Sequence, residues 1–155
     1  MYLDSRLSKF LAVFVMWAGG LLPPASAQQP KQFDYRVLAT NKTSTAEKEM
    51  NEAAAAGYVF AAVMGGETGF GGSEVVVVMM KGPADGQERS YRLLATSRTS
   101  TMQKEMQQLG KEGFDYRGQT VFSSTFGGKE VVVIMERTPG TGAKTYEFRL
   151  LATSR

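Results

Sequence analysis

Two glutamates and three arginines recur at equivalent places along this sequence, and such residues can support acid/base chemistry or binding. Glu74 and Glu130 each open a valine-rich segment, whereas Arg36, Arg92 and Arg149 each take the second position of YRVLAT, YRLLAT or FRLLAT. Paired carboxylates with arginines can form an acid/base site or a clamp for a carboxylate ligand. The same residues can instead form cross-strand ion pairs at the rim of a sheet, which stabilise a protein only slightly. We prefer this structural interpretation.

A second polar set lies in the other half of the chain. Asp115, Arg117 and Gln119 alternate with Tyr116 and Gly118, and alternation with period two predicts a strand that has one solvent-facing side. These three polar side chains are candidates for lining a groove that binds a ligand or a partner.

Composition removes most other kinds of site. The 155 residues include no cysteine and no histidine, which excludes thiolate catalysis, zinc fingers, iron–sulfur clusters, haem ligation, disulfides and a Ser-His-Asp triad. The glycine-rich stretch 65–72 lacks the lysine of a P-loop and joins two expected strands, so it is interpreted as a hairpin. No GxSxG nucleophile elbow occurs. We therefore expect no cofactor, no metal and no catalysis.

The net charge does not indicate a nucleic-acid partner. The chain carries 18 basic and 15 acidic residues, and removing the first 27 residues, which hold two basic residues and one acidic residue, leaves a net charge of +2. Nucleic-acid binding requires a clustered basic face. The basic residues from Arg89 to Arg98 are instead spread over an expected strand and turn.

The N-terminus has the three parts of a secretory signal peptide. Arg6 and Lys9 precede the apolar stretch Phe10–Leu22, and a small-x-small site follows, ending at Ala27. The apolar stretch is too short to span a bilayer, which takes about 20 residues. We expect cleavage between Ala27 and Gln28, a polar spacer over residues 28–32, and a mature protein in the periplasm or outside the cell with no stable membrane anchor.

The rest of the chain is an internal repeat. Tyr35–Met79 aligns without gaps on Tyr91–Met135 at an offset of 56 residues, with 20 identities in 45 positions. Residues 149–155 then repeat residues 92–98 exactly as RLLATSR. Such self-similarity shows duplication of one structural unit. The expected units are residues 33–90 and 91–145, and residues 146–155 are either the start of a third unit or a closing strand.

Each unit has the signals of a strand, a helix and two further strands. The first strand alternates, with Phe33, Tyr35 and Val37 on one side. Ser44 with Glu47, and in the second unit Ser100 with Gln103, satisfy the capping-box pattern S/T-x-x-E/Q. The helix buries residues at i, i+4 and i+7, namely Ala46, Met50 and Ala53 in the first unit and Met102, Met106 and Leu109 in the second.

Glycines are expected to end both helices. Gly57 and Gly113 stand where a left-handed residue closes a Schellman motif, and the aromatics Tyr58 and Phe114 follow them. A hairpin then leads to a third strand that is apolar on both faces, which is typical of a central strand covered by two layers.

These signals predict an α+β protein. We expect two tandem β-α-β-β repeats that form a pseudo-twofold domain of antiparallel sheet with two helices, plus a C-terminal strand. One helix covers only one face of a three-stranded sheet. Packing of unit on unit, or of chain on chain, must therefore supply the second covering layer.

The unit resembles a family of small bacterial β-α-β-β domains of unknown function, in which a Gly-Trp pair often stands at the helix end. Gly57-Tyr58 and Gly113-Phe114 occupy that place here. The resemblance covers residues 35–137. It implies the β-α-β-β fold and implies no activity.

Together these features favour an exported, non-catalytic binding or structural module of the cell envelope. The alternative is a small carboxylate-based hydrolase acting on envelope glycans or peptides. A third class, a self-associating subunit, is suggested by the valine-rich strands, whose edges can pair with other chains. The expected protein partner is a second copy or another envelope protein.

Overall fold

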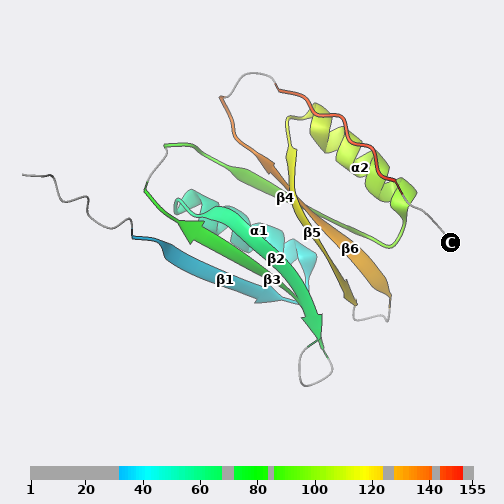
Figure 1. Cartoon of the computed structure of the whole chain (residues 1–155), viewed down its shortest axis with the longest axis horizontal. Helices are drawn as coiled ribbons and strands as arrows, with labels where there is room; N and C mark the ends of the chain where they lie inside the picture. Colours follow the sequence, from blue (N-terminus) through cyan, green and yellow to red (C-terminus); the bar gives the residue numbers. More distant parts are fainter. Residues whose placement is uncertain (1–31, 68–71, 84–85, 124–127, 141–143, 152–155) are drawn as a thin grey trace, which may run out of the picture. The chain divides into compact units, whose positions relative to one another are not determined.

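Each repeat folds in the expected order of strand, helix, strand and strand (Figure 1). The computed structural model describes residues 32–67, 72–83, 86–123, 128–140 and 144–151. The expected signal peptide with its Ala27–Gln28 cleavage site, the tips of both hairpins and residues 152–155 lie outside this part. The first repeat contains β1 (Asp34–Thr40), α1 (Thr43–Ala55), β2 (Val59–Glu67) and β3 (Ser73–Lys81), and the second contains β4 (Ser90–Thr96), α2 (Thr99–Lys111), β5 (Asp115–Ser123) and β6 (Lys129–Arg137).

The strands form two antiparallel sheets rather than one. The first has the order β1-β3-β2 and the second has the order β4-β6-β5. The valine-rich strands β3 and β6 are therefore central, as their doubly apolar sequences predict. The predictions of an α+β fold and of two β-α-β-β units are confirmed.

Both helices end at the predicted glycines. Gly57 and Gly113 have φ values of 86° and 88°. The Tyr58 N–H donates to the Ala53 carbonyl at 3.0 Å, and the Phe114 N–H donates to the Leu109 carbonyl at 2.9 Å, which is the long hydrogen bond of a Schellman motif.

The predicted capping boxes, in contrast, are wrong. Lys42 and Arg98 occupy the N-cap positions, neither helix has a side-chain cap hydrogen bond, and Ser44 and Ser100 lie inside the first turns. The turns before the helices are held by threonines instead: the Lys42 N–H donates to Thr40 Oγ1 at 3.2 Å, with an equivalent bond in the second repeat. The side chains expected to complete the boxes bind elsewhere, Glu47 to β4 and Gln103 to the C-terminal segment.

The two repeats stack so that the helix-covered face of the first sheet meets the face of the second sheet that points away from α2. On β6, Val132 and Ile134 join the core of the first repeat, whereas Val133 and Met135 pack with α2. The covered face of the first sheet thus meets the outer face of the second sheet. This stack is head to tail and differs from the expected pseudo-twofold relation, in which equivalent faces would meet.

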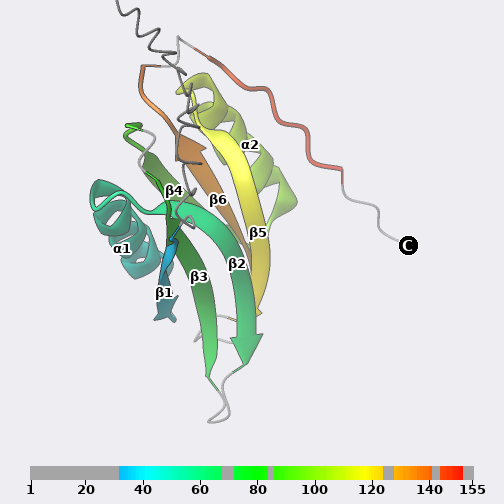
Figure 2. The same ribbon diagram turned by 60° about the vertical axis from the view of Figure 1, so that its left-hand side comes forward.

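Glycines permit the close approach of β2 to β5. A Cβ at Gly65 would lie 2.3 Å from the carbonyl oxygen of Val121, and one at Gly118 would lie 3.1 Å from the Phe60 ring. Figure 2 shows these two strands running beside each other. A side chain at Gly65 would force the sheets apart, so this position requires glycine.

The C-terminal segment, residues 144–151, lies along α2 (Figures 1 and 2). It is not part of either sheet. Its Tyr146 N–H donates to the Gly110 carbonyl at 2.9 Å, and Phe148 and Leu150 pack against the core of the second repeat. The described part of this segment therefore docks on a helix and does not close a sheet.

Candidate functional site

The recurring glutamates and arginines do not form the expected pairs. Strand register places Arg36 opposite Met79 and Glu74 opposite Gly66, at opposite ends of β3. The second sheet repeats this arrangement, with Arg92 opposite Met135 and Glu130 opposite Phe122. Within each sheet these arginines and glutamates are too far apart for a cross-strand ion pair or a shared clamp.

The arginines have other partners. The Arg36 guanidinium lies 4.7 Å from the centroid of the Tyr58 ring, and the Tyr58 hydroxyl donates to Asp34 at 2.5 Å. This hydrogen bond raises the pKa of Tyr58. Arg92 Nη1 lies 2.9 Å from Glu47 Oε1 on α1, and Arg149 is exposed on the C-terminal segment.

The most buried charge belongs to a residue that sequence reasoning did not select, Glu136 at the end of β6. Its side chain is 4% exposed. Oε1 pairs with Arg117 of β5 and lies 3.7 Å from Nε of Arg89, while Oε2 accepts a 2.7 Å hydrogen bond from the Tyr91 hydroxyl. A buried carboxylate is tolerated only when such partners replace water.

Strand geometry brings these groups together. The pairing of β5 with β6 shifts between Tyr116 and Gly118, so Arg117 lies at a bulge, a feature that re-aims a side chain. Tyr91 is 1% exposed, and its oxygen also accepts a 2.9 Å hydrogen bond from the Phe60 N–H of the first repeat. Burial, more than the neighbouring Glu136, raises the pKa of Tyr91 well above its usual range. The hydrogen bond to Glu136 likewise raises the pKa of Arg117, outweighing the opposing effect of burial.

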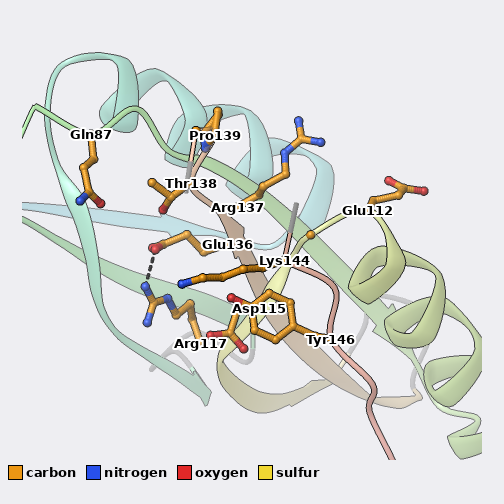
Figure 3. Close-up of a pocket in the computed structure, with 12 residues that line it drawn as sticks. Gln87, Glu112, Asp115, Arg117, Glu136, Arg137, Thr138, Pro139, Lys144 and Tyr146 are labelled. Atoms are coloured by element: carbon orange, nitrogen blue, oxygen red, sulfur yellow. Dashed lines mark hydrogen bonds and ion pairs between the residues drawn. The ribbon is translucent and has the colours of Figure 1, made fainter. Parts of the chain in front are cut away.

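A cavity of about 460 Å³ opens beside this cluster (Figure 3). Of the three polar residues considered for lining a groove, Asp115 and Arg117 line this cavity and Gln119 does not. Figure 3 shows the Lys144 side chain pointing toward Glu136 and Arg117, while Arg137 and Glu112 point away from them. Carboxylates and cations thus share one opening, and this mixture suits a ligand or protein segment bearing both charges.

The cluster has a sequence signal, visible when the two repeats are compared position by position. Glu136 stands where the first repeat has Met80, and Arg117 stands where it has Ala61. Asp115 and Arg89 likewise replace Val59 and Phe33. Polar residues that replace apolar ones at equivalent positions could therefore have identified this site.

A second set of polar contacts joins each helix to the segment that follows its repeat, which is β4 for α1 and the C-terminal segment for α2. Glu47 Oε2 accepts from the Leu93 N–H at 2.9 Å, and Asn51 makes two hydrogen bonds with the backbone of Tyr91. At the equivalent positions on α2, Gln103 and Gln107 bind the backbone of the C-terminal segment. These are the side chains that the capping-box prediction had assigned to helix starts, or their neighbours one turn later.

Comparison with protein-family models, curated proteins and solved structures found no match. Within the described residues, no helix is long and apolar enough to cross a membrane. No group of three or more acidic side chains in that part of the chain is arranged to hold a metal ion.

Proposed function

We propose that this protein is an exported, non-catalytic binding or structural module of the bacterial cell envelope. The proposal of export rests on the tripartite N-terminus. The resemblance to small bacterial β-α-β-β domains, which implies no activity, is compatible with a non-catalytic module. The expected partner is a protein, either a second copy or another envelope component, and not a nucleic acid.

The engagement of Glu136 carries the non-catalytic part of this proposal. Both of its oxygens already accept hydrogen bonds, one from Arg117 and the other from Tyr91. A general base or nucleophile must also reach its substrate, and the Glu136 side chain is 4% exposed. Glu136 instead links β4, β5 and β6, and through Tyr91 it reaches β2 of the first repeat. Its chemistry supports the fold.

A hydrolase is the second candidate, and the cavity is the observation that favours it. Asp115, Glu112 and Glu136 all line that opening, and two carboxylates at a cleft are the minimum for acid/base hydrolysis. Asp115 is our choice for a catalytic acid at this opening: it lines the cavity, accepts a hydrogen bond from the adjacent Tyr116 N–H and interacts with the Arg117 charge.

The two candidates differ in the effect of removing a carboxylate. Mature protein, Asp115→Asn and Glu136→Gln are incubated with purified peptidoglycan and with a mixture of unstructured peptides, and released products are measured by mass spectrometry. We expect no turnover from any of the three, with Glu136→Gln alone lowering the unfolding midpoint. Turnover by the wild type that Asp115→Asn abolishes without loss of stability would establish the hydrolase.

A further inference from the structure

The first sheet leaves one apolar face uncovered. On this face lie Tyr35 and Val37 of β1, which are 59% and 62% exposed, and Phe33 just before the strand, which is 43% exposed. The equivalent face of β4 is covered: Tyr91 is 1% exposed and Leu93 is half-buried. Nearly identical sequences thus have opposite environments.

The difference lies in the helix of the preceding repeat. Tyr91 and Leu93 pack in one core with Met50 and Ala53 of α1. The backbone of β4 is held in the same place by Glu47 and Asn51 of that helix. For β1, no repeat precedes it among the described residues.

At the other end of the stack, α2 has an equivalent binding surface, here called the seat, which includes Gln103 and Gln107. The C-terminal segment occupies it. The Phe148 N–H donates to Gln107 at 3.1 Å and the Leu150 N–H donates to Gln103 at 2.6 Å. Gln103 and Gln107 are the equivalents of Glu47 and Asn51. Phe148 and Leu150 therefore stand in the places that Tyr91 and Leu93 take on α1.

The uncovered strand carries the stripe that this seat accepts. Aligned through the shared Arg-x-Leu-Ala-Thr, Tyr35 corresponds to Phe148 and Val37 to Leu150, and Phe33 corresponds to Tyr146. Both stripes read aromatic, aromatic, aliphatic at alternate positions. A strand edge with such a face is a ready surface for pairing with another chain.

We propose that the occupant of the uncovered face is a second copy of this chain: β1 of one molecule replaces residues 144–151 on α2 of another. The C-terminal segment then acts as an intramolecular strap that competes with this contact. Because the two surfaces differ, the contact is heterologous and can continue from copy to copy. It is independent of whether the protein binds or hydrolyses an envelope component.

The proposed contact between copies involves fewer strands than the contact between the two repeats. Val121 stands at the position equivalent to Gly65, where a side chain would meet backbone. The sheets of two copies are thus kept apart at this point, and association relies on β1 and α2. The strap, tethered to its seat, has the advantage of high effective concentration, so the wild type should be monomeric when dilute.

Analytical ultracentrifugation of the mature protein tests the strap. Phe148→Asp/Leu150→Asp should loosen it and lower the concentration needed for association by roughly tenfold or more. Adding Val37→Asp should restore the monomer. The matched control for the first change is Thr145→Asp/Arg149→Gln, which makes the same charge change at exposed positions of the segment and should behave like the wild type. The matched control for Val37→Asp is Asn41→Asp, beyond the end of β1, which should leave the association of the Phe148→Asp/Leu150→Asp variant intact.

Two results would overturn the proposal. One is a folded Phe148→Asp/Leu150→Asp variant, judged by circular dichroism, that stays monomeric at all concentrations. The other is association that persists with Val37→Asp present, which would show that the newly exposed core of α2 binds elsewhere.

Cross-linking gives a position-specific check, because the chain has no native cysteine. The Leu93 N–H donates to the Glu47 carboxylate in the stack, and the equivalent positions in two copies are Val37 and Gln103. Mixed Val37→Cys and Gln103→Cys proteins should form a cross-linked heterodimer with a short bismaleimide, while Asn41→Cys with Gln103→Cys should not. Equal yields from both mixtures would refute the proposed register.

Discussion

At the scale of single residues, Glu136 and Arg117 are a pair of differences between the two repeats that depend on each other. The first repeat has Met80 and Ala61 where the second has Glu136 and Arg117. A lone carboxylate at 4% exposure would be costly, and a partner removes much of that cost. Glu136 and Arg117 are therefore expected to depend on each other, so their contributions to the free energy of unfolding should be coupled.

Restoring the residues of the first repeat tests this coupling. Glu136→Met should lower the free energy of unfolding by about 1–3 kcal/mol, because Arg117 and the Tyr91 hydroxyl lose their shared acceptor. Adding Arg117→Ala should cost less than in the wild type, with a coupling energy of roughly 0.5–3 kcal/mol. Urea unfolding can be followed by circular dichroism. Tryptophan fluorescence does not serve here, because the one tryptophan, Trp17, falls within the expected signal peptide. Strict additivity would contradict the coupling.

Tyr91 should make the fold sensitive to alkali. Its pKa is raised in the folded protein by burial, whereas an unfolded tyrosine titrates near 10.0. The folded state therefore keeps a proton that the unfolded state loses, so this contribution to stability is complete below about pH 10 and declines above it, by at most about 1.4 kcal/mol per pH unit.

Tyr91→Phe removes the titrating group. It should be less stable than the wild type at neutral pH, by about 1 kcal/mol for the lost hydrogen bonds, yet lose less stability as the pH rises beyond 10. The urea midpoint measured across this range gives the slope. Tyr116→Phe, at a residue that is 40% exposed, is the matched control. If Tyr91→Phe lost stability with rising pH as steeply as the wild type, Tyr91 would not be the source of the alkali sensitivity.

At the scale of elements, the two ends of each helix are determined differently. The C-terminal end depends on a local requirement, the positive φ at Gly57 and Gly113. The N-terminal end lacks a side-chain cap, because Lys42 and Arg98, whose side chains carry no hydrogen-bond acceptor, take the N-cap positions and leave Ser44 and Ser100 inside the first turns. Glu47 binds the β4 edge and Gln103 binds the C-terminal segment.

Substitution at Gly113 measures the local requirement. Gly113→Val should cost on the order of 1–2 kcal/mol or more, because φ is positive and the new Cβ would lie 3.2 Å from the Lys144 carbonyl oxygen. Gly113→Asn should cost less, since asparagine tolerates this conformation. The same pair of changes at Gly57, whose nearest neighbour is the flexible Lys81 side chain, is the control for crowding. Equal melting midpoints for Val and Asn would be inconsistent with a conformational cause.

At the scale of the whole molecule, the repeats cover one another in sequence. Among the strands that the structure describes, only β6 is buried on both faces, between the first repeat on one side and α2 with the C-terminal segment on the other. A head-to-tail stack always has two unlike ends. Here one end is filled by residues 144–151, and the other is the exposed face of β1.

Export is the remaining expectation at this scale. If the N-terminus is a signal peptide, the exported protein should begin at Gln28, because signal peptidase cleaves after a small-x-small site. Intact-mass measurement of protein from the periplasmic and culture fractions checks this. Recovery with Met1 intact, or recovery only from the integral membrane fraction, would contradict it.

The sequence alone determined the features that depend on neighbours along the chain. These are the 56-residue repeat, the order of strand and helix, the glycine stops and the central places of β3 and β6. Each follows from periodicity or from a backbone angle that one residue must adopt. Of the candidate site, the strand that carries Asp115 and Arg117 was predictable for the same reason.

The tertiary structure decided everything that depends on contacts between distant segments. Tyr35 and Tyr91 share a sequence context, and only the presence of α1 buries one and leaves the other exposed. Glu47 satisfies the capping-box pattern, but the helix begins at Thr43 with Lys42 as its N-cap, and the Glu47 carboxylate binds a strand edge 46 residues away. The direction of the stack and the cluster at Glu136 arise in the same way, because burial and hydrogen bonding across repeats can override local preference.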